Sequence, residues 1–286
     1  MRTQSVNPVE ARASTARVLV MGILNVTPDS FSDGGTFFDP GFAVRQGEQM
    51  AAQGADLIDI GGESTRPGAE SVPEHEELRR VVPVVRQLAR RVRAALSVDT
   101  SKATVAEHAI AVGATIINDV TAMRGSPRMA HVIARTGASV ILMHMRGTPK
   151  TMQQRPRYHH VVDEITRWLV DAAARAELAG IARERIFIDP GLGFGKTVRH
   201  NLALLQHLGQ LVDTGFPVVI GPSRKSFLGA LTGAELHDRL GGTLACVAQA
   251  FRCGGRIVRV HDVKPAVEML RVLEYLEQGD ATRRQH

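Results

Sequence analysis

The sequence has few cysteines, few aromatic residues and no long apolar run. Its two cysteines, Cys246 and Cys253, provide neither a disulfide framework nor the spacing of a zinc site, which fits a reducing compartment such as the cytoplasm. No apolar stretch approaches the roughly 20 residues that span a bilayer, and the N-terminus lacks an apolar signal segment, so we expect no membrane contact and no secretion. Because aromatic residues make up only 4% of the 286 residues, the core must be aliphatic.

The net charge is +6, from 35 Lys and Arg residues against 29 Asp and Glu residues. Arginine is interleaved with glutamate, as in residues 74–93, which is typical of solvated helix faces, so we expect no nucleic-acid partner. Lysine is scarce, and each lysine follows shortly after a predicted strand end. That placement suggests ammonium contacts to an anionic ligand. The lysines are Lys102, Lys150, Lys196, Lys225 and Lys264.

Eight short apolar runs recur about every thirty residues, and nearly every one ends in a polar or charged residue. Their lack of alternation predicts strands buried on both faces of a parallel sheet, and the stretches between them have helical spacing. Eight such units predict a (β/α)8 TIM barrel, an α/β fold with its active site at the carboxyl ends of the strands. The runs are Val18–Leu24, Asp56–Ile60, Leu96–Val98, Thr115–Ile117, Ser139–Met143, Ile186–Ile188, Pro217–Ile220 and Ile257–Val260.

The length suits one domain. We expect a disordered lead-in at residues 1–16, the barrel at 17–279 and a polar tail at 280–286. The predicted helices cover residues 40–54, 74–93, 102–112, 126–136, 158–179, 199–213, 235–253 and 262–278. Two of the loops that follow predicted strands are long and rich in Gly, Pro, Ser and Thr: residues 26–39 and 61–73. Long polar loops at neighbouring strand ends predict mobile flaps over a pocket.

Acids and amides end several of the predicted strands: Asp99, Asn118, Asp119 and Asp189. One such carboxylate often caps the next helix, but several at one barrel mouth favour a ligand with adjacent N–H donors, such as a 2-aminopyrimidinone edge. A metal cluster would also require histidine. The glycine-rich segment 189–197 lacks the spacing of a phosphate loop and instead leaves room for a flat ligand.

The last two strands carry a candidate anion site. Arg259 and His261 alternate, so both side chains face the same side, and loops after strands seven and eight form the usual phosphate site of this fold. The alternative is a structural arginine paired with a carboxylate. Asn25 at the first strand end either caps a turn or provides an oxygen ligand for Mg²⁺. Phe31 is an apolar ring in a polar loop and suggests a lid residue.

Taken together, the motifs resemble those of the dihydropteroate synthase family. The likeness runs from about Val18 to Glu274, and so many ordered motifs are highly specific. They are Met21–Gly35, Gly61–Gly68, Ser97–Thr100, Ile117–Val120, Asp189–Lys196, Ser223–Ser226 and Arg259–Asp262.

The resemblance implies condensation of (7,8-dihydropterin-6-yl)methyl diphosphate with 4-aminobenzoate in folate synthesis, by an SN1-like route, in a homodimeric enzyme that uses Mg²⁺. The implied catalytic residues are Asp99, Arg259 and His261, and the implied metal ligand is Asn25. The implied pterin diphosphate residues are Thr65, Asp99, Asn118, Asp189, Lys225, Arg259 and His261. The implied aminobenzoate residues are Phe31, Asp33, Arg66, Pro67, Phe194 and Ser223.

Two other functions remain open from the sequence. A methyltetrahydrofolate-binding methyltransferase would keep the pterin acids but has no use for Arg259, His261 and the first flap. A non-catalytic pterin-binding paralogue would keep the pocket but does not require intact flaps.

Overall fold

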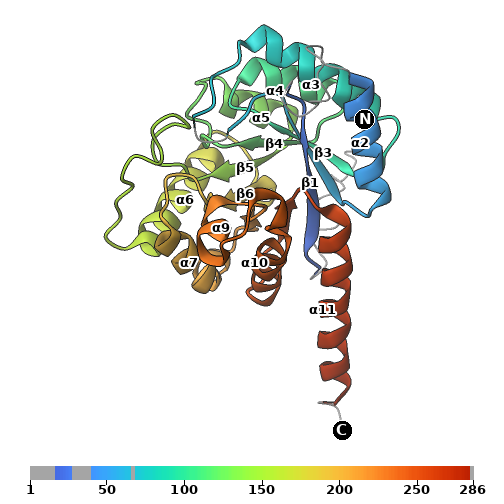
Figure 1. Cartoon of the computed structure of the whole chain (residues 1–286). Coiled ribbons are helices and arrows are strands. Elements are labelled where there is room, and N and C mark those ends of the chain that lie inside the picture. Colours follow the sequence, from blue (N-terminus) through green and yellow to red (C-terminus); the bar gives the residue numbers. More distant parts are fainter. Residues whose placement is uncertain (1–16, 28–39, 66–67, 284–286) are drawn as a thin grey trace.

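The computed structural model describes residues 17–27, 40–65 and 68–283. Its strands form one parallel sheet in the order β6-β5-β4-β3-β2-β1-β8-β7 (Figure 1). A parallel bridge between Ile188 and Val218 joins the two end strands, and the amide of Ile188 donates to the carbonyl of Pro217 at 3.0 Å. The sheet therefore closes on itself, and the predicted TIM barrel is confirmed. The strands are β1 (Leu19–Asn25), β2 (Leu57–Gly61), β3 (Ala95–Asp99), β4 (Ile116–Asp119), β5 (Ser139–Met143), β6 (Ile186–Asp189), β7 (Val219–Ile220) and β8 (Ile257–Val260).

Helices follow the strands and cover the outside of the barrel (Figure 1). The helices are α2 (Pro40–Ala52), α3 (Glu74–Leu88), α4 (Ala103–Ala111), α5 (Met129–Thr136), α6 (Val161–Leu178), α7 (Val198–Gln206), α8 (Leu208–Val212), α9 (Ser226–Thr232), α10 (Leu240–Arg252) and α11 (Val263–Arg283), with short 3₁₀ turns η2 (Arg183–Arg185) and η3 (Leu236–Asp238). Most agree with the predicted ranges to within a few residues.

Three helix predictions differ from the structure. The helix expected at 199–213 is two helices, because His207 leaves helical geometry with φ −109° and ψ 29°. The helix expected at 235–253 is only α10, and α9 before it was not predicted; α9 ends where Gly233 adopts a left-handed conformation with φ 73°. Helix α11 extends to Arg283 instead of ending at 278.

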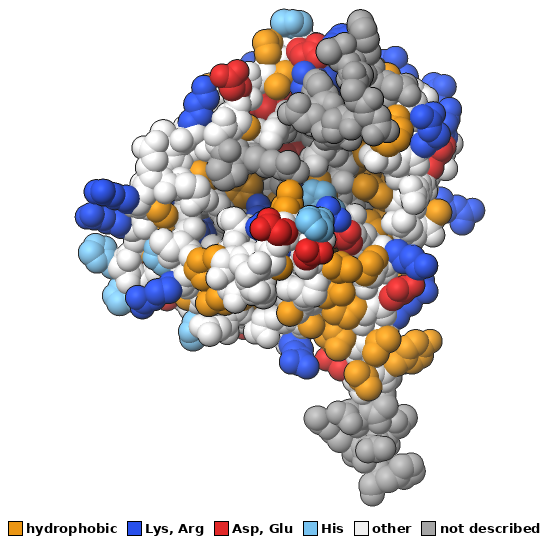
Figure 2. Space-filling view, in the orientation of Figure 1, with side chains coloured by type: hydrophobic (Ala, Val, Ile, Leu, Met, Phe, Trp, Pro, Cys, Tyr) orange, Lys and Arg blue, Asp and Glu red, His pale blue; other side chains and the backbone are white. Residues whose placement is uncertain are grey.

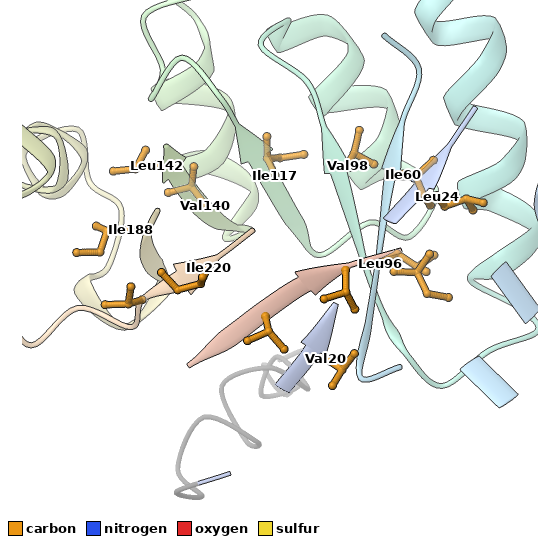
Figure 3. Packing of buried hydrophobic residues seen from close by; sticks show 14 of the residues in the cluster. Val20, Leu24, Ile60, Leu96, Val98, Ile117, Val140, Leu142, Ile188 and Ile220 are labelled. Carbon is orange, nitrogen blue, oxygen red and sulfur yellow. The ribbon is translucent and has the colours of Figure 1, made fainter. Parts of the chain in front are cut away.

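The strands bury both of their faces, as their continuous apolar runs require. Outward side chains such as Val20, Ile60 and Val98 pack in the main core against the helices (Figure 3). Burial of one Val, Leu or Ile side chain contributes about 1.5–3 kcal/mol, so this layer is a major part of the folding free energy. Inside the barrel, a second apolar layer consists of Leu19, Met21, Leu57, Ala95, Ile116, Ile141, Phe187, Val219 and Ile257.

Polar side chains lie above this inner layer, toward the carboxyl ends of the strands. Register places Asp99 opposite Asn118 and Met143 opposite Asp189. Met21 of the inner layer pairs with Arg259, so Arg259 also points inward. Because paired residues of parallel strands share a face, these groups all project into one barrel mouth.

Helix α11 projects beyond the barrel toward the C-terminus (Figure 1). None of the helices in the described ranges has both the length and the apolar content that a bilayer span needs.

Candidate active site

A pocket of about 320 Å³, its open mouth included, lies at the carboxyl ends of the strands. It brings together most of the residues predicted to bind the pterin diphosphate, and it adds the predicted aminobenzoate residue Phe194. Its lining residues are Thr65, Asp99, Asn118, Val120, Met143, Asp189, Gly191, Leu192, Phe194, Gly221, Lys225 and Arg259.

Arg259 sits between two buried carboxylates in this pocket. Its Nε donates to Asp59 Oδ2 at 2.6 Å, and a terminal nitrogen donates to Asp99 Oδ2 at 3.1 Å. The arginine side chain is 19% exposed, and Asp59 is not exposed at all. The interpretation of Arg259 as an arginine paired with carboxylates is confirmed; Arg259 also lines the pocket, and its contact with an anion stays a prediction.

Burial of the charged groups in the pocket shifts their pKa values. Burial raises the pKa of Asp99 to about 8; Arg259 opposes the shift, and Asp59 adds to it. Burial also raises the pKa of Asp189 to about 6, against the amide of Gly191 and the charge of Lys225. Burial disfavours the charge on Arg259, but the two carboxylates outweigh it and raise its pKa. One guanidinium thus compensates a pair of carboxylates.

The glycine-rich segment after β6 forms another part of the pocket wall. The amide of Gly191 donates to Asp189 Oδ1 at 2.7 Å, and Gly191 has φ +66°. A Cβ at this position would lie 2.1 Å from the carbonyl oxygen of His144, so only glycine fits. Further along, the ammonium of Lys225 lies 4.0 Å from the centre of the Phe194 ring. A cation and an aromatic face therefore meet at the rim of the pocket.

Comparison with known proteins agrees with this geometry. The family model described as pterin binding enzyme matches residues 21–261. The chain belongs to the pterin binding enzymes, and within them to the dihydropteroate synthases. It is 49% identical over 255 residues to the dihydropteroate synthase of Escherichia coli K12, covering 89% of this chain and 90% of that protein. The predicted family, the transferase activity and the role in folate biosynthesis are confirmed.

Solved structures of the family superpose closely. The Xanthomonas albilineans dihydropteroate synthase with 4-aminobenzoic acid is 48% identical, with a TM-score of 0.86, and covers 91% of this chain and 93% of its own. The same enzyme in complex with 7,8-dihydropteroate is 45% identical, with a TM-score of 0.84, and covers 92% and 95%. Such matches favour a synthase over the methyltransferase and the non-catalytic paralogue that the sequence left open.

Three predicted site residues of this synthase lie outside the set that lines the pocket. Ser223 Oγ contacts His261 Nδ1 at 2.9 Å and accepts from the amide of His261 at 3.1 Å. The two residues are therefore bound to each other across the ends of β7 and β8. Asn25 ends β1 opposite Gly61 and is half-buried. The predicted residues Phe31, Asp33, Arg66 and Pro67 lie outside the described residues.

Asn25 is the predicted ligand of Mg²⁺. Among the described residues, no group of three or more His, Cys, Asp or Glu side chains could hold a metal ion. Asn25 offers one neutral carboxamide oxygen at the barrel mouth. One protein oxygen together with phosphate oxygens of a substrate is a donor set that Mg²⁺ accepts. The residues thus fit an ion that binds together with a diphosphate, not a metal held by a protein cage.

Asp119 does not point into the mouth. It follows Asn118 in β4, so its side chain is on the other face of the strand. Its carboxylate accepts from the amides of Thr121 at 2.7 Å and Met123 at 2.9 Å and from the Thr121 hydroxyl. The prediction that Asp119 joins the ligand-binding acids was wrong; its carboxylate instead stabilises the turn after β4, several residues before the N-terminus of α5.

Lys225 lines the pocket, where its predicted contact with an anionic ligand stays a prediction, but two other lysines have partners within the protein. Lys102 is ion-paired with Glu63 and Glu77. Lys196 is 3% exposed and donates to His144 Nδ1 at 3.0 Å and to the carbonyl of Phe194 at 2.9 Å. Burial lowers the pKa of Lys196 to about 7.

Asp59 is the residue that the sequence interpretation missed. It accepts from Asn118 Nδ2 at 2.9 Å as well as from Arg259. A charged residue inside the apolar run Leu57–Gly61 was the available signal, since a fully buried strand position rarely holds an acid without a partner.

Proposed function

We propose that the chain transfers the pterinylmethyl group of (7,8-dihydropterin-6-yl)methyl diphosphate to 4-aminobenzoate, giving 7,8-dihydropteroate and diphosphate. The observation that carries this proposal is the single pocket that gathers Asp99, Asn118, Asp189, Lys225 and Arg259. The complexes of the Xanthomonas albilineans relative with 4-aminobenzoic acid and with 7,8-dihydropteroate support the same substrates.

The pocket floor is built to accept hydrogen bonds from a ring edge. Asp99 and Asp189 are carboxylic acids whose raised pKa values, about 8 and about 6, reflect burial without enough positive charge. The N–H groups of a pterin would supply the missing donors and favour the ionised carboxylates. Lys225, held over Phe194, would contact the ring from the rim, and Thr65 would lie between the two substrates.

The reaction requires an exocyclic carbon–oxygen bond to break, with its electron pair leaving on the diphosphate. The electron-rich pterin stabilises positive charge on the departing CH₂ carbon, and the nearby carboxylate of Asp99 would stabilise it further. Arg259 and His261 would neutralise the diphosphate. Mg²⁺, held by Asn25 and phosphate oxygens, would supply additional charge stabilisation for this leaving group. The arylamine nitrogen then forms the new C–N bond and loses its proton to water.

The second substrate would bind at the rim. Phe194 lines the pocket there, and Ser223 sits beside His261 at the end of the seventh strand. We propose that Phe31, Asp33, Arg66 and Pro67 complete this site from the loops after β1 and β2. Positioning a weakly basic amine in line with the carbon, rather than activating it, is the contribution expected of such loops.

We also propose that the enzyme is a cytoplasmic homodimer. Large apolar side chains are exposed on α11, and Figure 2 shows hydrophobic side chains gathered along this helix. They are Val272, Tyr275 and Leu276. An exposed apolar surface of this kind is typical of subunit interfaces. Both cysteines are free thiols, which suits the cytoplasm.

A coupled assay tests the proposed function. Purified protein with Mg²⁺ and the pterin diphosphate should release diphosphate only when 4-aminobenzoate is added, and dihydropteroate should form in equal amount. Asn118→Ala should weaken pterin binding because it removes a pocket acceptor. Diphosphate release without aminobenzoate would indicate a hydrolase instead. Tight pterin binding with no product would indicate a non-catalytic binding protein.

A further inference from the structure

Asp59 lies in β2 with its side chain completely buried inside the barrel. Its Oδ2 accepts from Asn118 Nδ2 at 2.9 Å and from Arg259 Nε at 2.6 Å, while its Oδ1 is buried and has no hydrogen-bond partner among the described residues. Asn118 and Arg259 line the pocket, and Asp59 does not. We propose that Asp59 is a positioning residue that fixes the polarity of Asn118 and the orientation of Arg259, and so selects ligands whose ring edge carries N–H donors.

The polarity of Asn118 follows from the chemistry of its partner. A carboxylate only accepts hydrogen bonds, so the amide NH₂ of Asn118 must face Asp59 and its carboxamide oxygen must face away. The oxygen is then the atom with which Asn118 can meet a ligand in the pocket. Without Asp59, the amide could rotate and present either a donor or an acceptor. Asp59 therefore makes this position an acceptor only.

Arg259 is oriented through the same oxygen. Of its five N–H donors, one on Nε is directed to Asp59 and one on a terminal nitrogen to Asp99, and these two contacts set the plane of the guanidinium. The remaining donors are the ones that can bind an anion. A side chain held from two sides has little rotamer freedom left to lose when the ligand binds.

An isolated buried carboxylate is costly, and burying one with an orphaned oxygen is more costly still. A hydrophobic residue at position 59 would pack with the apolar layer below it, which contains Leu57 of the same strand. The acid is thus better explained by what it does to its two partners than by stability.

This inference rests on the proposed binding of the pterin by Asn118 and Arg259. The test compares Asp59→Ala and Asp59→Asn with Ser97→Ala, a matched control because Ser97 pairs with Asp59 in the register and is equally buried. Calorimetry would measure affinity for 6-hydroxymethylpterin and for its lumazine counterpart, in which a carbonyl replaces the ring amino group. Thermal unfolding would confirm that each variant is folded.

The preference for pterin over lumazine should fall on the order of tenfold in Asp59→Ala, the scale of one mismatched buried hydrogen bond. In Asp59→Asn the Nε donor of Arg259 should keep the amide oxygen toward both partners, so this variant should retain the preference, as should Ser97→Ala. An unchanged preference in folded Asp59→Ala would overturn the inference and leave Asp59 a structural residue. If that variant does not fold, Asp59→Val gives the same test, because its side chain also lacks an acceptor and can pack with the apolar layer that contains Leu57.

A parallel measurement separates this inference from the proposed function. If Asn118→Ala leaves pterin affinity unchanged, the assignment of Asn118 to the pterin fails and the inference fails with it. If Asn118→Ala weakens pterin binding while Asp59→Ala leaves the preference intact, only the positioning role of Asp59 is lost.

Discussion

Removal of Arg259 should damage both folding and catalysis. In Arg259→Ala, the carboxylates of Asp59 and Asp99, now 2.6 Å and 3.1 Å from guanidinium nitrogens, lose the cation they share. Taking one partner out of a buried ion pair costs about 3–5 kcal/mol, a large part of the roughly 5–15 kcal/mol that stabilises a typical protein. Turnover should fall by about a hundredfold or more, since the proposed donor to the leaving diphosphate is lost.

The stability loss should also depend on pH. Asp99 has a pKa of about 8 in the folded protein, and Arg259 holds that pKa down. Without Arg259 the pKa rises further, so the folded variant retains a proton that the folded wild type releases. The free energy of unfolding of wild type therefore exceeds that of Arg259→Ala by a margin that grows as pH rises through 8.

Urea unfolding at pH 6.5 and pH 9, as rough limits either side of that pKa, would measure this margin directly. Arg259→Lys is the matched control: it keeps the charge but cannot span both carboxylates, so its loss should be intermediate. A variant Arg259→Ala whose stability lies within about 0.5 kcal/mol of wild type at both pH values would refute the reasoning.

Three further predictions concern the pocket and its wall. The stability of wild type relative to Asp99→Asn should fall from about pH 4 to pH 8, because the folded chain holds a proton that the unfolded chain has released, and urea unfolding across this range checks the sign. Gly191→Ala should be far more destabilising than Gly233→Ala in thermal melts: both glycines have positive φ, but only the first would bring a Cβ within 2.1 Å of the carbonyl oxygen of His144. Lys196→Met should cost about 1–3 kcal/mol, since it removes the donor to the ring and the carbonyl of His144 and to the carbonyl of Phe194. It should also raise the KM for aminobenzoate by loosening the Phe194 segment, and an unchanged KM would remove that link.

The barrel and most of the pocket could be predicted because strand ends are visible in the sequence. Each apolar run marks a strand, and the first polar residue after it marks the mouth, as Asp99 and Asp189 show. The residues at which helices begin and end were harder to predict from the sequence. No glycine or proline lies at the break at His207, whereas Gly233 at the end of α9 was a local signal that the sequence interpretation did not use.

Which residues belong to the site depends on the face of the strand from which each side chain projects. Asp119 and Asn118 are adjacent, and a strand places adjacent side chains on opposite faces, so only one of them could enter the mouth. Asp59 was not predicted as a site residue because it lies within an apolar run and not at its end. Lys102 pairs with Glu63 and Glu77, and Lys196 contacts His144; these partners lie far away along the chain, and no spacing in the sequence indicates such pairs.

The central claim is that one pocket at the barrel mouth binds the pterin diphosphate. A crystal structure of the chain with that substrate and Mg²⁺ tests it most directly. We expect the ring to lie against Asp99, Asn118 and Asp189, with the diphosphate directed toward Arg259 and His261. Density for the pterin on any other surface, with this pocket left to solvent, would contradict the account.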